Sequence, residues 1–488
     1  MDLNNLTIKK ARELLDKKEI SAVDLAKFYL KNIEEKNQDL NAYLEVYGDV
    51  LEQAKVADEK IAKGESEILT GIPLAIKDNI LIKGRKVSAA SKILENYTAT
   101  YDATVIEKLK KQGAVFLGRT NMDEFAMGGS TENSAYGVTK NPIDTSRVAG
   151  GSSGGSAVAV AADMSLGSLG SDTGGSVRQP ASFCGMVGLK PTYGSVSRYG
   201  LMAMGSSLDV IGPIGNTVSD VEILFDVMKG KDKMDSTSIE IETRLNDKVG
   251  QDSKLETENF KIGVPYHILD QEGVSADVKK NLEESIKKLE NLGYEIQDIK
   301  LPNIEKSLAV YYIIMPAEVS SNMARYDGVK YGLREEGADL LEVYKKTRGV
   351  GFGKEVRRRI ILGTYVLSSG YYHAYYNKAM LAREVIKNEF KTAFDTVDAI
   401  LTPTTPSPAF KIGEKSDPLA MYLADIFTVT ANIVGCPAIS LPSGFACPND
   451  SVGRAKVDGK DLPLGIQLMS PHSFENVLFE ISKKFLGE

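Results

Sequence analysis

The sequence predicts an α/β protein built on one large sheet, parallel or mixed. Between about residues 70 and 230, short apolar strand-like runs alternate with helix-like segments, which is the pattern of βα units. Strand-like sequence resumes at residues 261–265 after a polar interval. Hydrophobic residues make up 42% of the 488-residue chain and charged residues 26%, as in ordinary globular proteins. We therefore expect a single domain over residues 1–488.

The first 65 residues are predicted to form a helical segment of that domain. Residues 7–45 have the spacing of two amphipathic helices, and Ser21 with Asp24 three positions later forms a capping-box pattern at the start of the second.

The next elements follow in order. The apolar run 71–76 is bounded by Gly and Pro and predicts a buried strand that ends at Lys77. Residues 103–112 then read as a helix, 114–117 as a strand, 157–162 as a helix and 183–189 as a strand. Residues 231–258 are polar and poor in aromatic side chains, which predicts a surface excursion.

Two glycine-serine segments, 150–156 and 170–176, lie close together downstream of Lys77. A serine hydroxyl needs a base to become a nucleophile, and none of the three histidines, His267, His373 and His472, lies near either segment. Lysine can be that base only when its amine is neutral, which requires desolvation because free lysine titrates near ~10.4. The alternative is an exposed lysine at a strand end.

The second glycine-serine segment could hold an oxyanion. Glycines at 174 and 175 leave the backbone N–H groups of residues 173–176 unobstructed, so they can form a concave row of donors. Flexible linkers are the alternative for both segments, but apolar runs on either side argue against linkers. Residues 150–154 also match the G-x-S-x-G elbow with Ser152 as nucleophile, which would require His373 or His472 as base.

Three segments, 71–79, 150–157 and 170–181, together resemble the amidase signature family, and the resemblance covers nearly the whole chain. It implies a mixed, mostly parallel sheet covered by helices on both sides. It also implies that Ser176 is the acyl nucleophile, that Ser152 follows a cis peptide bond and bridges to the base, and that Lys77 is that base. The backbone N–H groups of Thr173, Gly174, Gly175 and Ser176 would form the oxyanion hole.

Within that family, the chain is most similar to the glutamine-hydrolysing A subunits of glutamyl-tRNA(Gln)/aspartyl-tRNA(Asn) amidotransferases. The segments that carry this similarity are 119–128, 321–328, 351–360, 425–432 and 436–442. It implies glutamine as substrate, with Arg358 meeting the α-carboxylate and Asp425 the α-ammonium. From the residues alone, a role for Asp425 in capping or stabilising the helix-like run that follows it is favoured, and Arg357 to Arg359 could form a solvated basic helix face or supply a single pocket-facing arginine.

The same similarity implies a heterotrimer with subunits B and C. Ammonia would pass to a partner subunit that holds the tRNA and uses ATP and magnesium, so we expect no cofactor and no metal in this chain. Two other functions remain open, a stand-alone amidase for other small amides and a non-catalytic interaction subunit. Whether Glu-tRNA, Asp-tRNA or both are the acceptor is also open. The chain departs from the pattern of these subunits at Gly129, Ala149, Ser195, Val210 and Asn216.

Composition excludes several classes of function. The net charge of −7 has the wrong sign for a chain that grips RNA phosphates. No apolar stretch reaches the ~20 residues needed to span a membrane, and the first residues lack a signal-peptide core, so we expect a cytoplasmic protein, with an organelle still possible. Cys184, Cys436 and Cys447 lack C-x-x-C spacing, which indicates reduced thiols. ATP chemistry is not expected because G-x-x-x-x-G-K-[ST] is absent.

Overall fold

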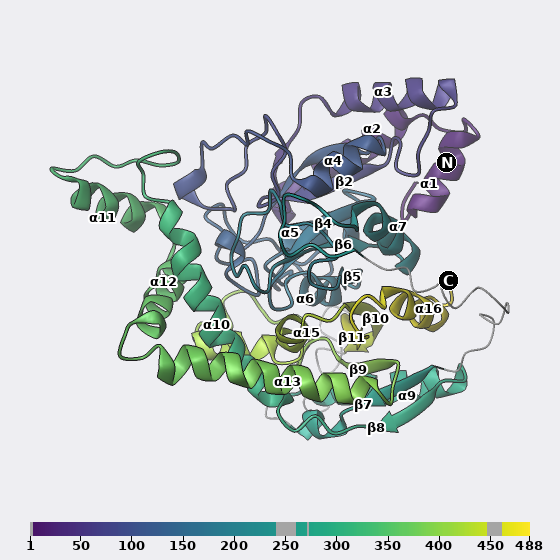
Figure 1. Cartoon of the computed structure of the whole chain (residues 1–488). Coiled ribbons are helices and arrows are strands. Elements are labelled where there is room, and N and C mark those ends of the chain that lie inside the picture. Colours follow the sequence, from purple (N-terminus) through teal and green to yellow (C-terminus); the bar gives the residue numbers. More distant parts are fainter. Residues whose placement is uncertain (1–2, 241–259, 271–272, 447–460) are drawn as a thin grey trace.

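A computed structural model describes residues 3–240, 260–270, 273–446 and 461–488 (Figure 1). These residues form one eleven-stranded sheet in the order β1-β3-β2-β4-β6-β5-β10-β11-β9-β7-β8, flanked by helices. The strands are β1 (Tyr43–Val46), β2 (Pro73–Lys77), β3 (Val115–Thr120), β4 (Gly167–Asp172), β5 (Val187–Lys190), β6 (Val210–Gly215), β7 (Lys261–Val264), β8 (Glu295–Asp298), β9 (Ala399–Pro403), β10 (Ala438–Ala446) and β11 (Leu462–Met469).

The sheet is mixed, as expected, but it is not mostly parallel. In the described chain four neighbouring pairs are parallel, β2 with β3 and β4, and β7 with β8 and β9. Six pairs are antiparallel, and they include the whole centre of the sheet from β4 through β6, β5, β10 and β11 to β9. Periodicity reveals which segments are strands but carries no information on their direction, so this part of the expectation was wrong.

The helices confirm most of the elements expected from sequence. They are α1 (Ile8–Asp16), α2 (Ala22–Leu40), α3 (Val50–Lys63), α4 (Thr104–Lys111), α5 (Gly154–Ala161), α6 (Arg178–Phe183), α7 (Val218–Met228), α9 (Ala276–Asn291), α10 (Ser307–Asn322), α11 (Leu340–Gly351), α12 (Lys354–Leu367), α13 (Lys378–Phe394), α14 (Pro418–Tyr422), α15 (Val429–Val434) and α16 (Glu475–Leu486).

Local sequence explains both the agreement and one error. Ser21 and Asp24 form the expected capping box at the start of α2. The strand expected over 183–189 begins only at Val187, because α6 continues to Phe183 and Gly185 turns the chain with a φ of 72°. The polar excursion expected over 231–258 lies outside the described residues from position 241 onward.

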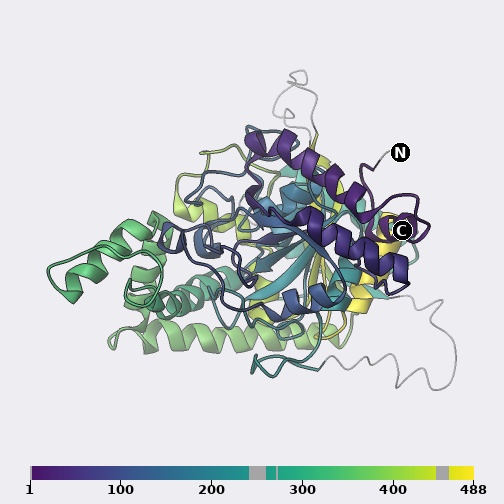
Figure 2. The same ribbon diagram turned by 90° about the horizontal axis from the view of Figure 1, so that it is seen from above.

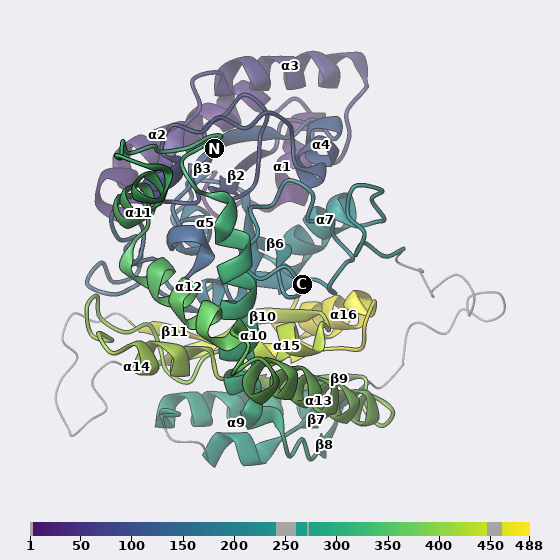
Figure 3. The ribbon, with the colours of Figure 1, turned by 60° about the vertical axis from the view of Figure 1, so that its left-hand side comes forward.

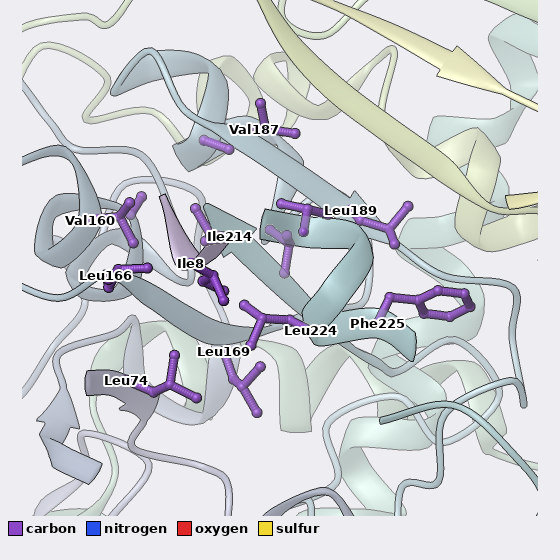
Figure 4. Close-up of a cluster of buried hydrophobic side chains, with 14 of the residues drawn as sticks. Ile8, Leu74, Val160, Leu166, Leu169, Val187, Leu189, Ile214, Leu224 and Phe225 are labelled. Atoms are coloured by element: carbon purple, nitrogen blue, oxygen red, sulfur yellow. The ribbon is translucent and has the colours of Figure 1, made fainter. Parts of the chain in front are cut away.

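The core holds the parallel strands β2 and β4 side by side. Leu74, Leu169 and Ile214 from adjacent strands of the sheet are fully buried in one apolar cluster (Figure 4), and burial of each such side chain stabilises the fold by roughly 1.5–3 kcal/mol. Because β2 and β4 are parallel, their carboxyl ends, Lys77 and Asp172, lie at the same edge of the sheet. Such an edge is where ligands bind in α/β proteins.

Helices α10 to α13 lie together beside the sheet (Figure 1). Helix α10 packs against α12, α13 and α15, and α11 projects away from the sheet in two views (Figure 1, Figure 2). Within the described residues, none of the helices has the length and apolar character needed to cross a bilayer.

Candidate functional site

Lys77 is the last residue of β2, and its amine is fully enclosed by the two glycine-serine segments. Its Nζ lies 2.8 Å from Ser152 Oγ, 2.7 Å from Ser153 Oγ and 2.9 Å from Ser171 Oγ. A further contact of 3.2 Å reaches the Ser171 carbonyl oxygen. The exposed strand-end alternative is therefore wrong, because the Lys77 amine is buried and surrounded by hydroxyl groups.

Burial lowers the pKa of Lys77 from 10.5 to about 7. Loss of water is the main cause, and the negative charges of Asp123, Asp172 and Asp209 oppose it. The pKa is thus brought close to physiological pH, where the neutral amine can accept a proton.

The Gly151–Ser152 peptide bond is cis, as the resemblance implies. The Gly151 N–H donates to Gln179 Oε1 at 2.8 Å, and the Ser152 carbonyl accepts from Asp123 N at 3.2 Å. A Cβ at position 151 would lie 2.2 Å from Asp123 Oδ2, so only glycine fits. These contacts fix the Ser152 hydroxyl beside Lys77.

Ser176 lies on the turn between β4 and α6, and 7% of its surface is exposed. Its carbonyl accepts from Ser153 N at 3.1 Å, which ties the two glycine-serine segments together. No direct hydrogen bond joins the Ser176 and Ser152 hydroxyls in the described structure. Catalytic hydrogen bonds of this kind are often long in ligand-free enzymes and shorten in the substrate complex.

The expected oxyanion donors divide into two groups. Gly175 N–H already donates to Asp172 Oδ1 at 2.8 Å, so it does not face a substrate and this part of the expectation was wrong. The N–H groups of Thr173, Gly174 and Ser176 have no acceptor among the described residues. Gly175 has a φ of 128°, and a Cβ there would lie 2.3 Å from Thr428 Oγ1, so the turn requires glycine at this position.

A buried ion pair holds this turn in place. Arg178 is fully buried, and its Nη2 lies 3.0 Å from Asp172 Oδ1. Arg178 also donates to Asn432 Oδ1 at 2.7 Å and Gln467 Oε1 at 2.9 Å. Burial alone would raise the pKa of Asp172. The charge of Arg178 and its hydrogen bonds outweigh burial and keep this pKa well below its usual value. Asp172 therefore stays ionised and fixes the conformation of residues 173–177.

Asp425 lies in a second, partly buried cluster of polar and aromatic side chains from α10, α12 and α14. Tyr312 donates its hydroxyl to Asp425 Oδ2 at 3.1 Å, and the rings of Tyr312 and Tyr422 stack with centroids 3.9 Å apart. The Arg359 guanidinium lies over both rings, at 5.7 and 5.6 Å. Burial raises the pKa of Asp425 to about 7, although the Tyr312 hydrogen bond and Arg359 lower it.

Arg358 is not brought into contact with Asp425. Its side chain is about half exposed and pairs with Glu355, which also accepts from Arg359 Nε at 2.8 Å and from the Tyr422 hydroxyl at 3.0 Å. Arg358 thus lies at the exposed edge of this cluster and Arg359 inside it. The Asp425 side chain has no capping contact with α15, so the helix-cap alternative for it is wrong in the described structure.

Sequence reasoning missed several residues of the site. Ser153 and Ser171 contact Lys77, and both lie within the glycine-serine segments that drew attention to this region. Arg359 is adjacent to the expected Arg358, but a run of three arginines gives no sign of which one is buried. Tyr312 and Glu355 carry no motif that would identify them.

Among the positions that depart from the amidotransferase pattern, Gly129 lies next to Asp425. A Cβ at Gly129 would lie 3.3 Å from Gln179 Nε2 and 3.6 Å from Asp425 Oδ1. The Gly129 carbonyl accepts from Gln179 Nε2 at 2.8 Å. Ser195 bonds to Thr192, and Asn216 to Leu6, away from the residues described above.

The positions of the histidines and cysteines test the remaining expectations from the sequence. Each of the three histidines contacts a group other than Ser152. His472 Nε2 lies 3.2 Å from the Val434 carbonyl oxygen, and His267 Nε2 lies 3.3 Å from the Leu301 carbonyl oxygen. His373 Nδ1 lies 2.8 Å from Asn377 Nδ2. A histidine-dependent elbow at Ser152 therefore has no support. Cys184 and Cys436 are free, buried thiols, and Cys447 lies outside the described residues. No group of three or more His, Cys, Asp or Glu suited to a metal occurs in the described part of the chain.

Known proteins are similar to this chain over nearly its whole length. The Amidase family profile matches residues 24–479. The A subunit of the glutamyl-tRNA(Gln) amidotransferase of Thermoanaerobacter pseudethanolicus is 52% identical over 99% of this chain and 96% of its own length. The corresponding subunit of Ruminiclostridium cellulolyticum is 51% identical over 100% and 98%. The crystal structure of the corresponding Thermotoga maritima protein is 42% identical, covers 99% of this chain and 95% of its own, and has a TM-score of 0.78.

Proposed function

The chain belongs to the amidase signature family, and we propose that it is the glutamine-hydrolysing A-type component of a tRNA-dependent amidotransferase. The observation that supports this most directly is the buried Lys77 amine in contact with Ser152, behind a turn that presents Ser176. Sequence identity of about half over the full length supports this specific component.

Acylation begins with attack of Ser176 Oγ on the side-chain amide carbon of glutamine. The Ser176 proton passes to Ser152 Oγ while the Ser152 proton passes to neutral Lys77. Negative charge develops on the amide oxygen, and the free N–H groups of Thr173, Gly174 and Ser176 are placed to stabilise it. Return of the proton to the amide nitrogen then releases ammonia and leaves a γ-glutamyl ester on Ser176.

Deacylation reverses the proton path. A water molecule attacks the ester, Ser152 and Lys77 accept its proton, and glutamate leaves when that proton returns to Ser176 Oγ. Because the lysine is neutral at the start of each half-reaction and charged only within it, a pKa near 7 suits both steps.

Selection of glutamine over other amides follows from its α-ammonium and α-carboxylate groups. Asp425 supplies the negative charge for the ammonium. Arg358 at the exposed edge of the cluster supplies a positive charge for the carboxylate, and rotation of its half-exposed side chain from Glu355 toward the substrate makes that contact. Arg359 keeps the Tyr312 and Tyr422 rings in place.

The released ammonia is used by other subunits of the complex. We infer that subunits B and C bind this chain, that one of them holds the tRNA, and that ATP and magnesium act there rather than here. The net charge of −7 agrees with an RNA site on another chain.

The test is reconstitution with subunits B and C encoded in the same genome. The wild-type complex should amidate Glu-tRNA(Gln) or Asp-tRNA(Asn) with glutamine, ATP and magnesium. The Ser176→Ala complex should lose amidation from glutamine and keep amidation from ammonium chloride, because only the ammonia source is removed. Hydrolysis of other small amides, with no amidation by any complex, would identify a stand-alone amidase instead.

A further inference from the structure

Helix α12, which runs between α11 and α10 (Figure 3), carries part of the cluster around Asp425 but does not cap its own start. Its N-cap is Gly353, which has no side chain, and no side-chain cap bond occurs there in the described structure. Glu355 in the first turn pairs with Arg358 and Arg359 instead. The start of the helix must therefore be held by another part of the chain.

Glu124 supplies that contact from a segment 229 positions earlier in the sequence. Its Oε2 accepts the Gly353 N–H at 2.8 Å. Its Oε1 accepts the Ser91 hydroxyl at 2.5 Å, and that hydroxyl also lies 3.2 Å from the Gly351 carbonyl oxygen. Only 2% of Glu124 is exposed, and a Cβ at position 353 would lie 2.3 Å from its Oε2. The buried carboxylate thus fixes the two glycines on either side of Phe352, where α11 ends and α12 begins.

An aromatic contact holds the same junction. Phe125, the neighbour of Glu124, has a φ of 49°, which is uncommon for a residue with a bulky side chain. Its ring packs edge-to-face on the ring of Phe352, with centroids 5.8 Å apart, and both side chains are buried. Backbone conformations of this kind persist only where the surrounding structure maintains them, and they are concentrated at functional sites.

The residue on the other side of Glu124 holds the segment that carries Ser152. The Asp123 N–H donates to the Ser152 carbonyl at 3.2 Å, and its carboxylate accepts three backbone N–H groups from residues 130–133. Two adjacent residues therefore contact two different parts of the site, Asp123 the serine segment and Glu124 the helix that carries Arg358. Because they are neighbours in the chain, they keep these two parts at a fixed separation.

We propose that Glu124 is a positioning residue for glutamine, which sets the start of α12 through the Gly353 N–H and thereby places Arg358 relative to Ser176. This proposal rests on the function proposed above. Arg358 lies in the second turn after Gly353, so a displaced first turn moves its side chain. Lys77 comes from β2 and Ser176 from the turn after β4, so neither depends on α12 for its position. Loss of the Glu124 contact should weaken glutamine binding and leave the chemical step unchanged.

The experiment measures ammonia release from glutamine by the complex reconstituted with subunits B and C. Glu124→Ala removes both acceptor oxygens, whereas Glu124→Gln keeps an amide oxygen that can accept the Gly353 N–H. Glu475→Ala is the matched control. Glu475 is also buried, at 3% exposed, and accepts the Thr192 N–H at 2.8 Å, but it lies at the start of α16, far from α12 (Figure 1). Circular dichroism and Tm confirm that each variant is folded.

We expect Glu124→Ala to raise the KM for glutamine at least about tenfold and to change kcat by less than about threefold. Glu124→Gln should raise KM by less than about threefold, because the acceptor is kept, and Glu475→Ala should lower Tm without changing KM. An unchanged KM in Glu124→Ala, a fall in its kcat alone, or an equal rise of KM in Glu475→Ala would overturn the positioning role and leave the proposed function intact. A wild-type complex that does not hydrolyse glutamine would refute the proposed function, and the positioning role with it.

A double variant tests whether the effect passes through Arg358. In an Arg358→Ala background, Glu124→Ala should change the KM for glutamine by less than about twofold, because the contact that it positions is already lost. A further tenfold rise in that background would contradict the proposal.

Ser91→Ala gives the same information if Glu124→Ala does not fold. It removes the hydroxyl that bonds to Glu124 and to the Gly351 carbonyl, but it keeps the Glu124 contact with Gly353. We expect a rise of about threefold in the KM for glutamine with kcat unchanged. A fall in kcat at an unchanged KM would contradict the positioning role.

Discussion

Substitution of Asp425 by asparagine separates recognition of glutamine from hydrolysis of its amide. Asparagine keeps the size of the side chain and can still accept the Tyr312 hydroxyl hydrogen bond, but it removes the negative charge. The partly buried α-ammonium of glutamine would then lie beside position 425 without a counter-charge. We expect a loss of about 2–3 kcal/mol in transition-state binding, or roughly 30- to 150-fold in kcat/KM.

The assay is ammonia release from two substrates, glutamine and glutaramate, which has the same amide and carboxylate but no α-ammonium. The loss should be large for glutamine and within about threefold for glutaramate. Asp417→Asn is the matched control, because Asp417 is an exposed residue that caps α14 through the Leu419 N–H, and asparagine caps equally well. Equal losses for both substrates would refute the assignment of Asp425 to the ammonium.

The pH dependence gives a second measurement on the same variant. With the pKa of Asp425 raised to about 7, protonation below pH 7 removes the charge that binds the ammonium, so the KM for glutamine should rise as pH falls from 8 to 6. In Asp425→Asn that group no longer titrates. A KM profile identical in the wild type and the variant would show that Asp425 does not bind substrate.

Three further predictions concern the groups around the two sites. Lys77→Arg should reduce kcat by more than about tenfold, because arginine stays charged and cannot accept the proton. In the wild type, kcat should fall as the pH drops below the Lys77 pKa of about 7, because the amine becomes protonated. A flat kcat profile from pH 6 to 8 would contradict the base role. Tyr312→Phe removes the hydrogen bond that lowers the pKa of Asp425, so the rise in KM should begin at a higher pH than in the wild type. Arg178→Met strands the Asp172 carboxylate and should lower the free energy of unfolding by about 3–5 kcal/mol in urea denaturation, whereas a loss under about 1 kcal/mol would show the pair to be dispensable.

The sequence predicted the elements whose signals are local. The α2 capping box, the strand that ends at Lys77 and the cis bond before Ser152 all rest on short motifs. Strand direction depends on how distant segments meet, so the antiparallel centre of the sheet was not predictable from periodicity. Gly175 shows the same limit, since its N–H points to Asp172 only once the buried Arg178 pair is formed.

The cluster of side chains around Asp425 was predictable only in part. Asp425 was identified by resemblance, but its surroundings come from α10, α12 and α14, which are separated by tens of residues in sequence. Three consecutive arginines differ in burial because α12 turns them to different sides, and that depends on α10 packing against the helix. The exposure of Ile361 and Leu362 on α12 has no sequence signal, because both read as core residues until the position of α10 is known.

The most direct test of the proposed mechanism is capture of the acyl-enzyme on Ser176. The full chain is mixed with glutamine, quenched in acid within milliseconds and digested, and the peptide that contains Ser176 is examined by mass spectrometry. We expect a γ-glutamyl adduct on Ser176 in the wild type, none in Ser176→Ala, and much slower formation in Lys77→Ala. An adduct on another residue, or glutamine hydrolysis by Ser176→Ala at the wild-type rate, would contradict the mechanism.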